Sequence, residues 1–173
     1  MYGRLEQAAD GRWRLAFTRT FGDSPESVWR AITEPSQLAA WFPTTIEGER
    51  APGAPLTFAF PQQQAPPFTG EMLTFEPMSL MELRWGTDAL RLELRGVDGG
   101  SQLTLTDTLE ELGRASLGAA GWHECLDALA VHLGADDTGA SWPSLFQAYV
   151  ERFGPEASTV GPPEGMLEGG AGG

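Results

Sequence analysis

Five short apolar segments separated by turn residues occupy residues 55–108, and this feature constrains the fold more than any other. Their sequences are PLTFAF, FTGEMLTF, LMELRW, ALRLELRG and SQLTLTDT. Apolar and polar side chains tend to alternate along them, as in strands that have one buried face. Because the connections are short, as at Gly86-Thr87, consecutive strands are predicted to pair antiparallel in a meander.

The turns also predict the register of three hairpins, because a slip of one residue would move every apolar side chain to the wrong face. The turns lie around Pro77-Met78, at Gly86-Thr87 (type II′) and over 97–100. The predicted apolar pairs are Met72 with Leu83, Leu83 with Leu90, Leu92 with Leu105 and Leu94 with Leu103. On the other face the predicted pairs are Glu71 with Arg84 and Glu82 with Arg91.

The apolar face of this sheet needs a cover, and residues 115–133 have the helical period that supplies one. Their apolar side chains recur in steps of three and four before Gly134: Ala119, Trp122, Leu126, Leu129 and Leu133. Residues 142–153 repeat the helical pattern. This second helix is predicted to pack on the body of the protein or on another copy of the chain.

The chain before the meander is predicted to form one strand and two short helices. Residues 12–20 alternate like a strand. Ser24 is a natural N-cap with Pro25 at the first helical position, which predicts a helix up to Pro35. A second helix is expected to carry Leu38, Trp41 and Phe42 on one face and to end at Pro43.

The composition excludes several functions. The net charge is −13, and all 11 basic residues are Arg, which argues against nucleic acid and membrane surfaces as partners. Without Lys, the chain cannot perform Schiff-base chemistry. The single cysteine, Cys125, cannot form an internal disulfide and cannot build a zinc site alone. No signal peptide or membrane-spanning run is visible. Together these features predict a cytoplasmic protein.

Four regions are predicted along the chain. They are an N-terminal arm (1–11), one domain (12–134), an additional helix (135–153) and a disordered tail (154–173), which has too few apolar side chains to offset its ordering entropy.

Several strings together resemble a known superfamily. They are FTRTFGDSPESVWRAITEPSQLAAWF, GEMLTFEPMSLMELRWG, SQLTLTDT and AAGWHECLDALAVHLG. They resemble the START-like (SRPBCC) superfamily and, within it, the bacterial branch similar to the activator of the ninety-kilodalton heat-shock protein ATPase. The resemblance implies an α+β helix-grip fold, in which a curved antiparallel sheet wraps around a long C-terminal helix and two short helices lie between the first two strands.

The resemblance also implies a cavity between sheet and long helix. Members bind lipids, hormones or polyketides there, some catalyse cyclisation or dehydration, and the eukaryotic activator binds a chaperone. Many relatives have a His near the end of the last strand where this chain has Asp107, so the role of that His does not transfer. Asp107 has the parity of Leu103 and Leu105, which directs it towards the helix. It is interpreted as a cap for the following turn, with a general acid or base as the alternative.

Residues predicted to line the cavity are mostly aromatic rings and flexible Met side chains, which suit an apolar ligand. They are Trp41, Phe42, Phe60, Phe68, Met72, Met81, Trp85, Asp107, Trp122 and Leu126. The alternative is that they fill an ordinary core.

The remaining polar candidates are interpreted as structural. His123, Glu124 and Asp127 are predicted to form a solvated surface cluster. A metal cluster at His132, Asp136 and Asp137 is rejected because these residues lie at a helix end without a closed geometry. Cys125 is expected to be a small buried hydrophobe.

No catalytic residue, metal or cofactor is therefore assigned, and three functions stay open. The preferred function is the binding of a small apolar or amphipathic molecule. The alternatives are a protein-interaction module, with a protein partner or a homodimer, and a cyclase or dehydratase acting on a polyketide-like substrate.

Overall fold

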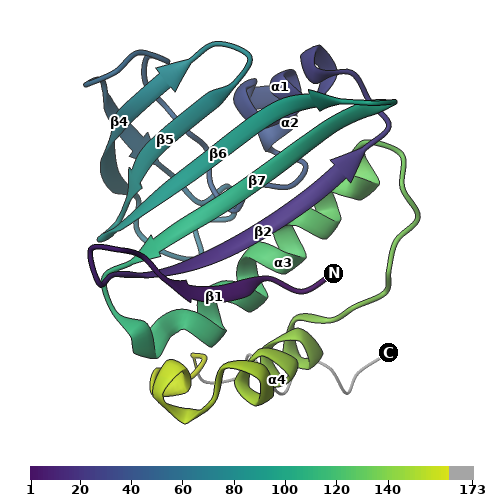
Figure 1. Ribbon diagram of the computed structural model, residues 1–173. Helices are drawn as coiled ribbons and strands as arrows, with labels where there is room; N and C mark the ends of the chain where they lie inside the picture. Colours follow the sequence, from purple (N-terminus) through teal and green to yellow (C-terminus); the bar gives the residue numbers. More distant parts are fainter. Residues whose placement is uncertain (164–173) are drawn as a thin grey trace.

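The computed structural model describes residues 1–163, and its strands form a single antiparallel sheet. The strands are β1 (Arg4–Gln7), β2 (Trp13–Phe21), β3 (Pro55–Phe58), β4 (Phe68–Glu76), β5 (Leu80–Trp85), β6 (Asp88–Val97) and β7 (Gly100–Leu109). Their order across the sheet is β1-β2-β7-β6-β5-β4-β3. The sheet is curved and its helices lie on one side (Figure 1), which confirms the predicted helix-grip fold.

The register of the meander is confirmed at the apolar pairs. Met72 lies opposite Leu83, Leu83 opposite Leu90, and Leu94 opposite Leu103. Gly86 has a φ of 61°, as the first central residue of a type II′ turn requires.

One part of the predicted register is wrong. The β4–β5 ladder shifts between Met72 and Thr74 and ends with Glu76 opposite Leu80, one residue away from the register set by Met72 opposite Leu83. An extra residue in β4 causes the shift, and Met78 closes the turn with a φ of 71°. The ladder begins at Met72, so the predicted pair of Glu71 with Arg84 lies outside it.

Two short helices, α1 (Pro25–Thr33) and α2 (Pro35–Leu38), follow β2. The Ser24 side chain caps α1 by accepting the Ser27 N–H. The second helix is shorter than predicted: it ends at Leu38, and the chain continues in a turn in which the Phe42 N–H donates to the Leu38 carbonyl at 2.8 Å. There the indole N–H of Trp41 donates to the Ala31 carbonyl at 2.8 Å, which holds this ring under α1.

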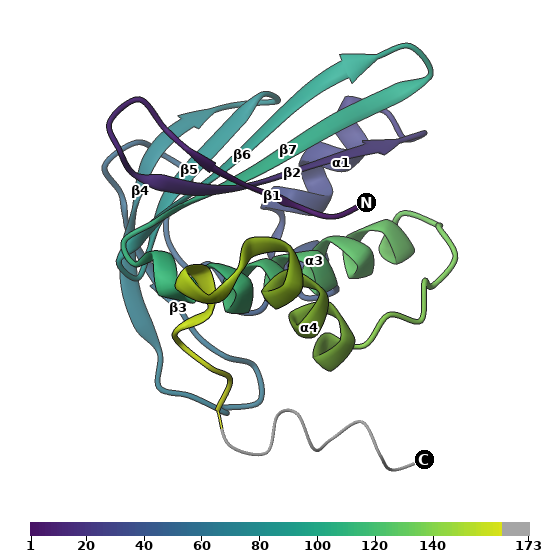
Figure 2. The same cartoon turned by 60° about the horizontal axis from the view of Figure 1, so that its bottom comes forward.

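The long helix α3 (Ala115–His132) follows a single 3₁₀ turn, η1 (Leu112–Arg114). It lies against one face of the sheet, and α4 (Trp142–Phe153) packs on α3 beside the β1–β2 edge (Figure 1 and Figure 2). The α3 helix is therefore buried on two faces. One face packs in the main core through Trp122, Leu126 and Leu129. The other face carries His123, which is buried near α4. Among residues 1–163, no helix is long and apolar enough to span a bilayer.

The two ends of the chain differ from the sequence prediction. The N-terminal arm contains β1, which pairs with β2. The predicted disordered tail begins too early, because Pro155–Ser158 form a 3₁₀ turn, η2. Ala157 is buried there and the Ser158 hydroxyl lies 2.7 Å from that of Ser116, which anchors this segment. The last part of the predicted tail, residues 164–173, lies outside the described residues.

Candidate functional site

The aromatic residues predicted to line a cavity contact one another. Phe42 is central: its ring centroid lies 5.4 Å from that of Trp41, 5.2 Å from that of Trp85 and 5.7 Å from that of Trp122. Phe68 also packs on Trp85, at 4.9 Å. Such edge and tilted contacts between rings are those of a filled core.

The other predicted lining residues extend this core. Met72, Met81 and Leu126 are buried in it, and Phe60 packs on Phe68 at its edge, with ring centroids 6.1 Å apart. Phe58, which was not predicted, packs on Trp85 at 4.9 Å.

Beside this cluster, a pocket of about 230 Å³ lies between α3 and the sheet. Of the predicted residues, Trp85, Asp107 and Trp122 line it. Residues not predicted complete the wall: Pro43, Asp88, Leu109, Arg114, Leu117, Gly118, Gly121 and Cys125. The pocket is therefore mainly apolar, with two carboxyl groups and a guanidinium.

Asp107 is the buried polar residue of this pocket. Only 2% of its surface is exposed, and its Oδ2 accepts the indole N–H of Trp122 at 2.9 Å. Its Oδ1 has no hydrogen-bond partner among the described residues. The inward direction predicted from strand parity therefore agrees with the structure.

The preferred interpretation of Asp107 as a turn cap is wrong. Asp88 caps that turn instead, since its Oδ1 accepts the Glu110 N–H at 2.9 Å. The physical reason is direction: the Asp107 side chain reaches α3, whereas Asp88 lies at the start of β6, next to the end of β7. Asp88 has the same strand parity as Leu90 and Leu92, so parity could have identified it.

Both carboxyl groups resist ionisation. The pKa of Asp107 is raised to about 7, chiefly by burial and also by the charge of Asp88 and a side-chain hydrogen bond with it, whereas the Trp122 hydrogen bond lowers it. Burial also raises the pKa of Asp88, while the Glu110 N–H bond, Arg114 and Arg12 lower it. Two such carboxyl groups, side by side, cannot both carry a full charge at low cost.

Gly121 leaves room on the α3 side of the pocket. A Cβ added at Gly121 would meet no atom within 4 Å, whereas one at Gly118 would lie 3.3 Å from Leu15 Cδ1. Glycine inside a helix costs about 0.5–1 kcal/mol relative to Ala. Close packing explains Gly118, but it does not explain Gly121, which borders empty space.

A family model matches residues 23–134, which is more than half of the chain. Its description is "Activator of Hsp90 ATPase homolog 1-like protein". The chain belongs to this family. The predicted resemblance to the SRPBCC superfamily is thereby confirmed, and every residue that lines the pocket lies within the matched range.

Several solved structures are similar to this chain in fold. The conserved protein of unknown function EF2215 from Enterococcus faecalis has a TM-score of 0.74 at 18% identity, covering 87% of this chain and 90% of its own. CalU16 from Micromonospora echinospora has a TM-score of 0.67 at 20% identity, covering 87% and 92%. The protein encoded by gene BPP1335 from Bordetella parapertussis has a TM-score of 0.65 at 24% identity, covering 87% and 90%. No curated protein matches the chain significantly.

Cys125 lies on the wall of the pocket. Burial, with a smaller contribution from the Glu124 charge, raises the pKa of its thiol to about 12. The thiol is therefore protonated at neutral pH and is a poor nucleophile.

We expect a thiol reagent such as DTNB to modify Cys125 on the order of 100-fold more slowly in the native protein than in urea at pH 8, because only the thiolate reacts. The release of thionitrobenzoate measures both rates. Equal rates would contradict the burial of the thiol.

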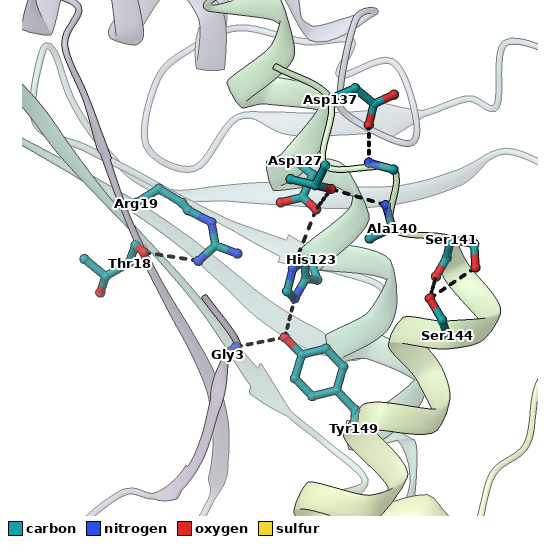
Figure 3. Close-up of polar contacts among 12 residues, drawn as sticks. Gly3, Thr18, Arg19, His123, Asp127, Asp137, Ala140, Ser141, Ser144 and Tyr149 are labelled. Atoms are coloured by element: carbon teal, nitrogen blue, oxygen red, sulfur yellow. Dashed lines mark hydrogen bonds and ion pairs between the residues drawn. The ribbon is translucent and has the colours of Figure 1, made fainter. Parts of the chain in front are cut away.

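The solvated cluster predicted at His123 is wrong, because α4 and the N-terminus cover this side of α3 (Figure 3). His123 is only 6% exposed, and its Nδ1 lies 2.7 Å from the hydroxyl of Tyr149 on α4. That hydroxyl accepts the Gly3 N–H at 2.8 Å, and His123 Nε2 lies 3.6 Å from Asp127. The network ties segments outside residues 23–134 to the family domain.

Tyr149→Phe tests this network. Loss of the hydroxyl leaves the buried Gly3 N–H and His123 Nδ1 without a partner, so we expect the free energy of unfolding to fall by about 2–3 kcal/mol. Urea denaturation measures it, with Tyr2→Phe as the control, since the Tyr2 side chain is exposed. A loss below about 0.5 kcal/mol would mean that these bonds do not hold α4.

Proposed function

We propose that this protein binds a small, flat and mainly apolar molecule with one polar group in the pocket between α3 and the sheet. The observation that carries the proposal is the buried Asp107 carboxyl, whose Oδ1 receives no hydrogen bond from residues 1–163, on the wall of an otherwise mainly apolar pocket. A buried polar atom without a partner costs free energy, and native structures seldom retain one without a reason. A bound polar group would supply the missing partner.

The pocket volume limits the size of the ligand. An engineered cavity of about 150 Å³ in another protein accepts benzene, so about 230 Å³ suits one or two fused rings. A long acyl chain needs more room. The indole rings of Trp85 and Trp122 border the pocket and offer flat apolar surfaces for such rings.

The polar groups of the pocket define where the ligand's own polar group lies. With a pKa near 7, Asp107 is partly protonated at neutral pH, so it can donate a hydrogen bond to a carbonyl or accept one from a hydroxyl. Arg114 is exposed at the rim. The most favourable orientation therefore directs a carbonyl or hydroxyl to Asp107 and the rings along the two indoles.

A matched pair of ligands tests the proposal. The two-ring ketone α-tetralone is expected to quench tryptophan fluorescence with a Kd of about 10 μM to 1 mM. Tetralin has the same rings without the carbonyl, and we expect it to bind about tenfold more weakly because Asp107 then gains no partner. Palmitate serves as the long-chain control. Tighter binding of palmitate, or no quenching by either ring compound, would contradict the proposal.

The protein-interaction alternative has less support. Within residues 1–163 the exposed large hydrophobic residues are Met1, Tyr2, Met78 and Val131. They lie at the N-terminus, in the β4–β5 turn and near the end of α3, so they form no continuous apolar patch. An interaction site would be expected to present such a patch.

A further inference from the structure

Two carboxyl groups from neighbouring strands share the pocket. Asp107 lies opposite Leu90 across the β6–β7 ladder, and Asp88 precedes Leu90 by two residues on the same face of β6. Side chains in such diagonal positions lie about 7–8 Å apart at their Cα atoms and can interact. Both residues line the pocket.

The environments of the two groups are unequal. Asp107 is buried and receives one hydrogen bond, from the Trp122 indole. Asp88 is less buried and receives the Glu110 N–H; burial raises its pKa, whereas that hydrogen bond, Arg114 and Arg12 lower it. In such a pair the proton resides on the more buried carboxyl while its neighbour stays ionised, and this division separates a general acid from a general base.

We propose that Asp107 and Asp88 act as a general acid and a general base on a carbonyl compound bound in this pocket, and catalyse its keto–enol interconversion. This inference rests on the proposed function, because the carbonyl group must first lie beside Asp107. The substrate class is a ring ketone with a hydrogen on the carbon next to the carbonyl. Asp107 and Asp88 would be the catalytic residues.

The proton transfers balance without any further reactant. Asp107 donates its proton to the carbonyl oxygen, and Asp88 takes a proton from the adjacent carbon. The C–H electron pair forms the carbon–carbon double bond of the enol, and the carbonyl π bond becomes the O–H bond. The proton then passes from Asp88 to Asp107, directly or through water, and the reverse reaction returns a solvent proton to carbon.

The other ionisable groups near Asp107 and Asp88 are not suited to act as the acid or the base. Cys125 is protonated because burial raises the pKa of its thiol to about 12. Arg12 and Arg114 are cations that favour the Asp88 carboxylate, whereas Glu110 opposes it. The charged groups around Asp88 therefore support its role as the base.

Deuterium exchange measures the reaction directly. In buffered D₂O, α-tetralone bound to the wild-type protein should exchange the hydrogens next to its carbonyl on the order of 100-fold faster than in buffer alone, as general acid–base catalysis provides. Mass spectrometry of the extracted ketone gives the rate. The rate should fall above about pH 7, where Asp107 loses its proton.

Three variants separate catalysis from binding. Asp107→Asn and Asp88→Asn should bind α-tetralone within about tenfold of wild type and lose the acceleration, whereas Asp98→Asn, in the exposed β6–β7 turn, should keep both. Binding to the wild type without accelerated exchange overturns this inference and leaves the proposed function intact. Acceleration that survives in both pocket variants also overturns it. No binding to the wild type overturns the proposed function and this inference together.

Discussion

Asp107→Asn is expected to raise the free energy of unfolding at pH 8 by about 2–4 kcal/mol. The pKa of Asp107 rises to about 7 in the folded protein from its ordinary value of 3.8. Between these values the folded state binds more protons than the unfolded state, so wild-type stability falls as the pH rises. Asn does not ionise, and its carbonyl oxygen can still accept the Trp122 N–H.

The pH dependence of this stability gain distinguishes loss of the buried charge from a general change in packing. The gain from Asp107→Asn should shrink to well below about 1 kcal/mol near pH 4, because the carboxyl is then protonated in the folded protein and only about half ionised in the unfolded chain, where its pKa is 3.8. Urea denaturation at pH 4, 6 and 8 gives the profile, with Asp98→Asn as the matched control on an exposed turn. If Asp107→Asn changed stability equally at all three pH values, the carboxyl would not be an uncompensated buried group.

Gly121→Leu is expected to weaken the binding of α-tetralone by at least about 100-fold, with the domain still folded. Its Cβ would meet no atom within 4 Å, so the larger side chain fills the pocket rather than the core. Replacement of glycine inside a helix also removes a cost of about 0.5–1 kcal/mol. The variant should therefore be at least as stable as the wild type.

Gly121→Ala is the matched control for this prediction. It gains the same helix propensity with a single methyl group, so it should be slightly more stable than the wild type and bind with nearly unchanged affinity. Fluorescence titration gives the affinity and thermal denaturation gives the stability. Undiminished binding by Gly121→Leu would place the ligand elsewhere.

Most of the sheet could be predicted because local signals determine it. Alternating side chains assign the two faces, and turns such as Gly86-Thr87 set the register. The strand β1 was missed because its sequence, RLEQ, has a single large apolar residue, and only its pairing with β2 defines it as a strand.

The surroundings of α3 were harder to predict because they depend on distant segments. His123 lies opposite the apolar stripe of its own helix, which suggested exposure. It is buried by Tyr149 of α4 and by the N-terminal residues. The amphipathic pattern of 142–153 showed that this helix needs a surface to pack on, but not which one.

The candidate site could be predicted only in part. Strand parity correctly directed Asp107 inward, and the same rule applied to Asp88 would have added the second carboxyl. Parity cannot distinguish rings that line empty space from rings that touch, since this depends on packing in three dimensions. Phe42, between three other rings, is the example.

The central claim is that a small ring compound binds between Trp85, Trp122 and Asp107. The indole N–H signals in a ¹H–¹⁵N NMR spectrum test it most directly, because the chain has 6 Trp residues and Trp122 donates its N–H to Asp107. On addition of α-tetralone, we predict that the Trp122 and Trp85 signals shift while those of Trp29 and Trp142 stay in place. Unchanged Trp122 and Trp85 signals, or shifts confined to Trp29 or Trp142, would contradict the claim.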